Sequence, residues 1–212
     1  MASIAVIGGT GQLGKGIARR LAKAGHDVTI GSRSAEKAQA AATELGGIGA
    51  AANEDAAVGK DFVIVTVPYA NQKPTLELIR DKVGDAIVVD TTVPLVPPKV
   101  MRVQLPPAGS AGQIAQDILG DDVRVVSAFQ NVAAHHLQEG HALDCDVLVC
   151  GNDKEARAQV ITLVEAAGMR GFHAGSIANA AAAEALTSLL IFINKQYSCH
   201  AGIRITGLAD SD

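Results

Sequence analysis

Aromatic residues are scarce in this chain of 212 residues: they make up 3% of it, and tryptophan is absent. The hydrophobic residues, which reach 48%, are therefore mostly aliphatic or small, and a sizeable core can form from them. Alanine and glycine let backbones approach closely, so the composition favours tight packing of helices on a sheet. The length suits one domain of ordinary size plus a small appendage.

Other features are missing as well. The net charge of −4 lacks the positive excess expected of a protein that binds nucleic acid or an anionic membrane. Three cysteines, Cys145, Cys150 and Cys199, form no disulfide pattern, and we expect them to be reduced in a cytoplasmic protein. No spacing of His and Cys matches a zinc site, so no metal is predicted. The chain does not open like a signal peptide, and no apolar run approaches the ~20 residues of a membrane span.

Short β-branched runs alternate with helical patterns along most of the chain, which is typical of parallel βαβ units. The predicted strands are 4–7, 28–31, 62–67, 87–90, 124–128 and 147–150, with weaker candidates at 47–51 and 171–174. The predicted helices are 12–24, 35–45, 71–83, 112–119, 154–167 and 177–196. We therefore predict an α/β fold: a doubly wound Rossmann domain with a mainly parallel sheet over residues 1–175. A small C-terminal helical element over residues 176–212 follows it, and we expect this element to contribute to substrate binding or to dimerisation.

One segment breaks this rhythm. Five of the seven prolines fall between Pro94 and Pro107, where neither a regular helix nor a central strand can form. Ligands of open α/β sheets bind beyond the carboxyl ends of the strands. The segment is either a stiff wall of a substrate pocket or a plain surface connection.

A glycine-rich motif, GxGxxG, directly follows the first predicted strand and opens the first predicted helix. Gly9 permits the tight turn, Gly11 lets a pyrophosphate approach the backbone, and Gly14 lets helix and strand pack closely. The phosphates then meet free amides at the positive end of a helix. The predicted dinucleotide-binding residues of this motif are Gly9, Thr10, Gly11, Gln12, Leu13 and Gly14.

The second predicted strand indicates which dinucleotide is bound. NAD sites place an acidic residue at the tip of this strand, whereas this chain has Ser32 and Arg33 there, with Lys37 one helical turn further on. A hydroxyl and cations hold a 2′-phosphate that a carboxylate would repel, so we predict NADP(H). Thr66, Val67 and Pro68 are also predicted to bind this cofactor, because they end a strand beside the site.

These segments resemble the NADPH-dependent coenzyme F420 reductases, also called F420:NADP oxidoreductases. The resemblance runs through residues 7–16, 31–33, 66–68, 93–96, 125–128, 146–151 and 184–187, which is nearly the whole chain. It implies a homodimer that passes a hydride between NADP(H) and the deazaflavin coenzyme F420, the small-molecule substrate. The substrate-binding residues that it implies are Val93, Pro94, Gln130, Asn131, Val132, Ala133 and Leu208.

The chain departs from this family at two positions. Archaeal members have a His where this chain has Gln130, and an Arg where it has Ala181. Gln130 can still hydrogen-bond a deazaflavin carbonyl or ring nitrogen. The phosphate and acidic tail of the coenzyme need cationic or amide partners, and the candidates are Lys99, Arg102, Lys195 and Arg204.

Hydride transfer between the two cofactors needs no obligatory catalytic side chain, because the cofactors carry the reactivity. An NADPH-dependent reductase of a small imine or carbonyl compound is the alternative, and it would need a proton donor. The candidate donors are Tyr69, His135, His136 and Tyr197. A non-catalytic NADP(H)-binding sensor is a third reading.

Overall fold

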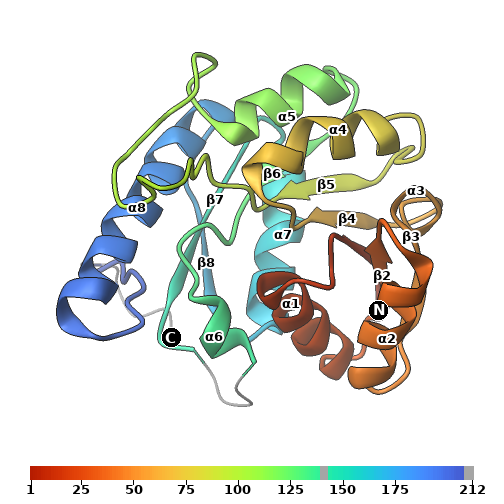
Figure 1. Cartoon of the computed structure of the whole chain (residues 1–212). Coiled ribbons are helices and arrows are strands. Elements are labelled where there is room, and N and C mark those ends of the chain that lie inside the picture. Colours follow the sequence, from red (N-terminus) through yellow and green to blue (C-terminus); the bar gives the residue numbers. More distant parts are fainter. Residues whose placement is uncertain (139–142, 208–212) are drawn as a thin grey trace.

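A single twisted sheet organises the molecule (Figure 1). The computed structural model describes residues 1–138 and 143–207. Within them eight strands follow the order β3-β2-β1-β4-β5-β6-β7-β8. The strands are β1 (Ser3–Ile7), β2 (Asp27–Ser32), β3 (Gly49–Ala52), β4 (Phe62–Val65), β5 (Ile87–Asp90), β6 (Val125–Ser127), β7 (Asp146–Gly151) and β8 (Arg170–His173). Neighbouring strands are parallel except β6 and β7, which are antiparallel, so the predicted mainly parallel sheet is confirmed.

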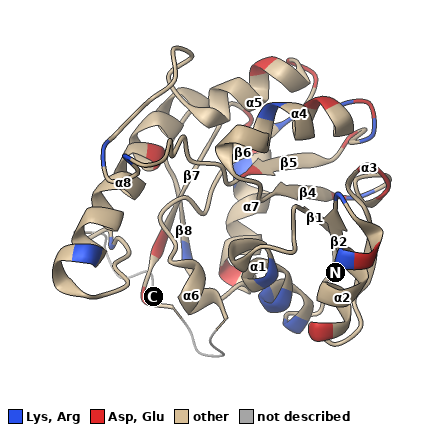
Figure 2. Cartoon of the chain, viewed as in Figure 1, with Lys and Arg blue, Asp and Glu red and all other residues tan. Residues whose placement is uncertain are grey.

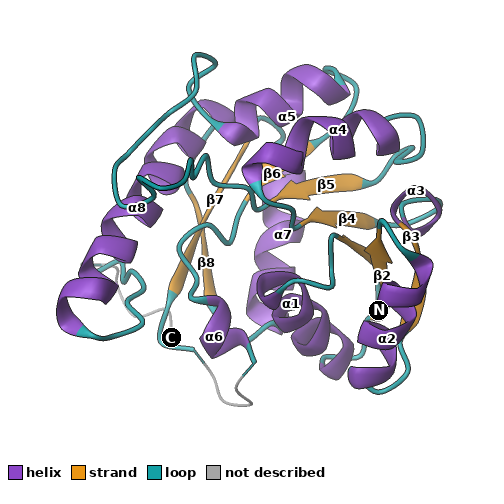
Figure 3. Cartoon of the chain, in the orientation of Figure 1, coloured by secondary structure: helices purple, strands orange, loops and turns teal. Residues whose placement is uncertain are grey.

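Helices cover both faces of the sheet (Figure 3). They are α1 (Gln12–Lys23), α2 (Ala35–Glu44), α3 (Asn53–Ala56), α4 (Tyr69–Ile79), α5 (Ala111–Leu119), α6 (Ala134–Leu137), α7 (Lys154–Ala166) and α8 (Ala180–Tyr197), with a 3₁₀ turn at Ile177–Asn179 before α8. One apolar core joins the sheet to α1, α2 and α7, and a second joins it to α3, α4 and α5.

The alternation of side chains along each strand produces these two cores. In β4, Phe62 and Ile64 face the α1 side, while Val63 and Val65 face the α4 side, and all four are buried. Because both faces of such a strand are covered, its sequence reads as a continuous apolar run rather than as an alternation. That is why the strands could be found in the sequence.

Most predicted elements lie within a few residues of the observed ones, and α3 and α6 were not predicted. Each of these two helices has four residues, which is too short to show a helical period. Asp153 is the N-cap of α7, and its side chain accepts a hydrogen bond from the Ala156 amide at 2.6 Å. Asn152 instead accepts a hydrogen bond from the Ile177 amide, and so ties the start of the 3₁₀ turn to β7.

The last helix corrects one expectation from the sequence. Within Ile177–Tyr197 a window of 18 residues reaches a mean hydropathy of 1.5, and the helix is long and apolar enough to cross a membrane by length and composition. Alanines and scattered large apolar residues give this value without a continuous apolar run. One such helix is weak evidence for a membrane span, and its buried share of 28% shows that much of its apolar surface is uncovered.

The proline-rich segment between β5 and α5 is a long loop that crosses over α8 (Figure 3). Ser188 of α8 donates a hydrogen bond to the main-chain carbonyl of Arg102 in this loop at 3.4 Å. The loop therefore links the sheet edge to the last helix, and it covers the region beyond the carboxyl ends of the central strands.

Candidate functional site

A cleft of about 990 Å³ lies beyond the carboxyl ends of β1, β2, β4, β5 and β6, where the strand order reverses. Open α/β sheets bind ligands at this point because loops diverge there and leave a crevice. The described residues that line it are Gly8, Thr10, Gly11, Gln12, Leu13, Ser32, Arg33, Ser34, Lys37, Asn53, Thr66, Val67, Pro68, Tyr69, Asn71, Thr75, Thr91, Thr92, Val93, Leu95, Pro97, Val100, Phe129, Gln130, Val132, Ala134 and Thr187.

The three glycines of the GxGxxG motif differ in what surrounds them. A Cβ at Gly9 would lie 2.6 Å from the Val6 carbonyl, and one at Gly14 would lie 2.7 Å from the Gly9 Cα. Both glycines are therefore required for packing of the turn and of α1. At Gly11 a Cβ would come no closer than 3.7 Å to the protein, although Gly11 lines the cleft. The space at Gly11 is thus left open for a ligand.

The N-terminus of α1 points its amides into this cleft. Gly11 is the N-cap residue and offers no side chain, and the first turn of the helix holds no acidic residue. The leading amides of a helix have no partner within it and carry partial positive charge. This end of α1 is suited to a phosphate group.

Three polar side chains gather at the end of the cleft where β2 meets α2. Ser32 ends β2 and is buried, while Arg33 and Lys37 are exposed beside it. Ser34 caps α2 by accepting a hydrogen bond from the Lys37 amide, which fixes the turn between strand and helix. Among the described lining residues there is no carboxylate, and Arg33 and Lys37 are the cations. The local charge suits an additional phosphate rather than a free ribose diol.

The opposite end of the cleft is formed by the turn after β6 and by the proline-rich loop. Phe129 has a backbone φ of +72° although it is a bulky residue, and burial to 1% exposure holds it there. Gln130, Val132 and Thr187 line the cleft on this side, and the loop contributes the apolar residues Val93, Leu95, Pro97 and Val100. The proline-rich loop is therefore a wall of the pocket.

Two buried carboxyl groups lie behind this wall and do not line the cleft. Burial raises the pKa of Asp90 to about 6, against hydrogen bonds from Thr92 and Gln72 that lower it. Burial also raises the pKa of Glu184 to about 8, although the amides of Ala111 and Gly112 donate to its two oxygens. These groups hold elements together: Glu184 joins α8 to α5, and Asp90 joins β5 to α4 through Gln72.

The predicted site residues divide into those in the cleft and those beside it. Most of the predicted cofactor residues line the cleft, while Gly9 and Gly14 pack behind it. Of the predicted substrate residues, Val93, Gln130 and Val132 line the cleft. Pro94 is buried in the loop, Asn131 donates to the Ala183 carbonyl of α8, and Ala133 lines a separate pocket of about 300 Å³. Leu208 lies outside the described residues.

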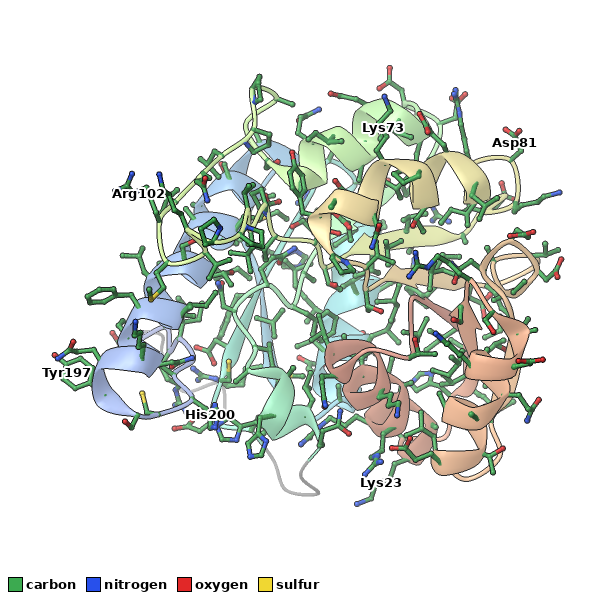
Figure 4. The ribbon with its side chains drawn as sticks, viewed as in Figure 1. Lys23, Lys73, Asp81, Arg102, Tyr197 and His200 are labelled. Atoms are coloured by element: carbon green, nitrogen blue, oxygen red, sulfur yellow. The ribbon has the colours of Figure 1, made fainter. Side chains whose placement is uncertain are left out.

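The candidate proton donors separate in the same way. Tyr69 lines the cleft, whereas His135 and His136 contact His200 outside it. The ring of His135 stacks on that of His200 at a centroid distance of 4.7 Å, and the ring of His136 meets it edge-on at 5.3 Å. Tyr197 points into solvent at the end of α8 (Figure 4).

None of the candidate cations for the coenzyme tail lines the cleft. Arg204 forms an ion pair with Asp144, and Arg102 extends outward from the proline-rich loop (Figure 4). Lys99 and Lys195 are exposed elsewhere.

Several residues that the structure brings into the cleft were not predicted from the sequence. Asn53 follows the weak strand β3, and its side-chain oxygen accepts a hydrogen bond from the Gly8 amide at 3.3 Å. Thr91 and Thr92 belong to a segment with no binding motif, and Thr187 lies in segment 184–187, which carried the family resemblance but no predicted binding role. The polar residues directly after the buried strand β5 were the available signal for the first two.

The strand order, the glycine turn and the carboxylate-free phosphate end define a dinucleotide-binding protein of the Rossmann class. The family model described as NADP oxidoreductase coenzyme F420-dependent matches residues 3–94. The chain is 41% identical to the F420-dependent NADP reductase of Methanocaldococcus jannaschii over 97% of this chain and 98% of that one. It is 39% identical to the enzyme of the same name from Methanothermobacter thermautotrophicus, over 99% and 97% of the two chains.

A solved structure agrees with this relationship. It is a candidate F420-dependent NADP reductase from Arthrobacter sp. FB24, 28% identical, with a TM-score of 0.86 over 98% of this chain and all of that one. The chain belongs to the family of F420-dependent NADP reductases and is an oxidoreductase.

Proposed function

We propose that this protein transfers a hydride between NADP(H) and coenzyme F420. The observation that carries the proposal is the two-ended cleft: a phosphate-binding end with Arg33 and Lys37, and an opposite end with apolar walls and amide groups. Full-length identity of 41% to a protein named for both cofactors supports the same pairing.

The residues of the cleft would act by binding and orientation. The amides at the start of α1 would hold the pyrophosphate, and Ser32, Arg33 and Lys37 would hold the 2′-phosphate. Thr66, Val67 and Pro68 would lie along the ribose and nicotinamide, and Val93 and Val132 would exclude water from the rings. When bound, the two cofactors supply the hydride-donating and hydride-accepting carbons. Fixed alignment in dry surroundings is the contribution of the chain.

The direct test mixes the purified protein with NADPH and oxidised F420 and follows the visible absorbance of the deazaflavin. We expect rapid bleaching that depends on both ligands and is much weaker with NADH. Tight NADPH binding without bleaching would contradict the proposal and favour the alternative reductase of an imine or carbonyl compound, with Tyr69 as its candidate proton donor. Binding without turnover of any such substrate would favour the sensor.

We further propose that the protein works as a cytoplasmic homodimer and that residues 176–212 form its C-terminal helical element. Leu189, Phe192, Ile193 and Tyr197 recur at helical spacing on one exposed side of α8. Few charged residues lie along this helix, in contrast to α1, α2 and α4 (Figure 2). Such a surface favours a second copy of the chain as its partner.

A further inference from the structure

Gln130 has a side-chain oxygen without a partner. Its nitrogen, Nε2, donates to the main-chain carbonyl of Asp90 at 3.0 Å and to Ser127 Oγ at 2.8 Å. Because a carbonyl can only accept, the nitrogen of the amide must face Asp90, and the oxygen Oε1 faces away from it. Oε1 is buried and accepts no hydrogen bond in the part of the chain that is described.

The turn that carries Gln130 is held on several sides. Thr187 of α8 donates its hydroxyl to the main-chain carbonyl of Gln130 at 2.9 Å, and Asn131 donates to the carbonyl of Ala183 at 2.8 Å. Phe129 precedes them with its positive φ and is buried. Gln130 itself is 6% exposed. The direction of its side chain is therefore fixed by the fold and not by a ligand.

An unpartnered acceptor in the interior loses its interaction with water and gains nothing in return, so such atoms are rare in folded proteins. Gln130 lines the cleft, four strand spacings from Ser32, or about 19 Å at the usual separation of strands. The residue that carries the unpartnered oxygen therefore lies at the end of the cleft remote from Ser32.

We infer that Gln130 Oε1 accepts a hydrogen bond from an amide-type N–H of the ring system bound at this end, and selects ligands that carry one. The inference rests on the proposed function, which brings two such groups here: the carboxamide of nicotinamide and the imide of the deazaflavin. Because Oε1 has almost no exposed surface in the structure, the inference requires the side chains that cover it to shift when a ligand binds. The sequence was also compatible with Gln130 donating a hydrogen bond to a ligand carbonyl. Its Nε2 instead uses both hydrogens in bonds to the protein, so it does not donate to the ligand.

The test removes the N–H from each ligand in turn. In one arm, calorimetry without F420 compares NADPH with its 3-acetylpyridine analogue, whose acetyl group has no N–H. In the other arm, steady-state kinetics compare the KM of F420 with that of a deazaflavin methylated at the imide nitrogen. Each comparison is made in the wild-type protein, in Gln130→Met and in Gln116→Met.

Gln116 provides the matched control. It is similarly buried, and its Nε2 also donates two hydrogen bonds. Their acceptors are the main-chain carbonyls of Gly120 and Val123, at 2.8 and 3.0 Å. It does not line the cleft. Loss of two donated bonds and the accompanying loss of stability are thus common to both variants, and only Gln130→Met removes the free acceptor.

We expect the wild-type protein to disfavour the ligand without the N–H by about tenfold in one arm, the value of a buried hydrogen bond. The arm that shows it identifies the group that is bound. Gln130→Met should reduce this discrimination to within twofold, and Gln116→Met should keep it. Equal use of both ligands by the wild-type protein in both arms would overturn the inference, and so would discrimination that survives in Gln130→Met.

These outcomes are separable from the proposed function. If the wild-type protein binds NADPH but does not reduce F420, the proposed function fails. The calorimetric arm then decides the role of Gln130 alone, since it needs no deazaflavin. Wild-type discrimination against the acetylpyridine analogue would uphold the inference in that case, and its absence would overturn it.

Discussion

Ser32, Arg33 and Lys37 meet at one end of the cleft because β2 ends there and α2 begins after the single residue pair Arg33 and Ser34. Their proximity is a consequence of local geometry, since the residues lie within six positions of one another. A sequence motif of this kind can be interpreted without knowledge of the rest of the fold. The nucleotide preference was predictable for that reason.

Replacing Arg33 by Ala tests this preference. The guanidinium would form charge-assisted hydrogen bonds to the 2′-phosphate, which NADH lacks. We expect Arg33→Ala to weaken NADPH binding at least about tenfold and NADH binding less than twofold. The tenfold value is at the small end of the range for a hydrogen bond between charged groups, because Arg33 is exposed. Calorimetric titration of both nucleotides measures the two losses, and equal losses would refute the assignment.

Gln130 and Glu184 show the limit of sequence reasoning at this scale. The role proposed for Gln130 follows from where its amide nitrogen is held, by Ser127 and by the main chain of Asp90, 40 residues away. Glu184 contacts amides that lie more than 70 residues earlier. Neither arrangement leaves a local pattern, so only the folded chain could reveal them.

At the scale of elements, the start of α5 depends on α8. Ser110 caps α5 by accepting from the Gln113 amide, and Glu184 accepts from the amides of Ala111 and Gly112. These bonds satisfy the leading amides of the helix, which would otherwise be buried without partners. Glu184 is 1% exposed, close to Asp90 and to Cys150, whose thiol pKa is raised by burial to about 11.

The raised pKa of Glu184 predicts a pH dependence of folding. A carboxyl group with a higher pKa in the folded state than in the unfolded state stabilises the fold fully at pH values below its unfolded-state pKa. This stability is lost as the pH rises through its folded-state pKa. Asp90 acts in the same direction up to about pH 6. Between pH 6 and 8 the decline should therefore come mainly from Glu184, whose folded pKa is about 8.

We expect the free energy of unfolding, measured with urea at pH 5, 6, 7 and 8, to fall over the upper part of this range. In Glu184→Gln, which keeps an acceptor but does not titrate, the fall between pH 6 and 8 should be reduced. Glu165→Gln, at an exposed position of α7, serves as the control. A wild-type profile retained in Glu184→Gln would show that this carboxyl is not responsible.

The elements themselves were predictable where the chain gives a long enough signal. The apolar runs of β4 and β5 and the capped helix α7 were located closely, because burial on both faces and a capping residue leave marks in the sequence. The direction of β7, in contrast, could not be predicted. It lies antiparallel to β6, and a β-branched run carries no information about its direction.

At the scale of the whole molecule, α8 forms an outer edge and leaves an apolar side uncovered (Figure 1). The neighbouring proline-rich loop adds Met101, Val103 and Leu105, which are also exposed. The packing of α5, β7 and the loop on the other side of α8 fixes which residues remain outside. The sequence showed an apolar helix but could not distinguish its buried side from its free one.

We expect the wild-type protein to sediment at twice the 21.7 kDa of one chain, and Phe192→Glu to shift it toward the single chain. A charge at this position would lie in the proposed interface, where leaving it without a partner is costly. Val58→Glu is the matched control, because Val58 is 55% exposed, as Phe192 is, but lies far along the chain between α3 and β4. A single-chain mass for the wild-type protein at micromolar concentration would contradict the dimer, and sedimentation with lipid vesicles would point to a membrane instead.

The most direct measurement of the central claim follows the transferred atom. NADPH carrying deuterium at C4 of the nicotinamide, in each of its two stereochemical forms, is mixed with the protein and oxidised F420 in ordinary water, and the reduced deazaflavin is analysed by mass spectrometry. Two rings aligned in one dry cleft should pass deuterium to the deazaflavin from one form and not from the other. Loss of the label to water, or equal transfer from both forms, would contradict a fixed and shielded alignment of the two cofactors.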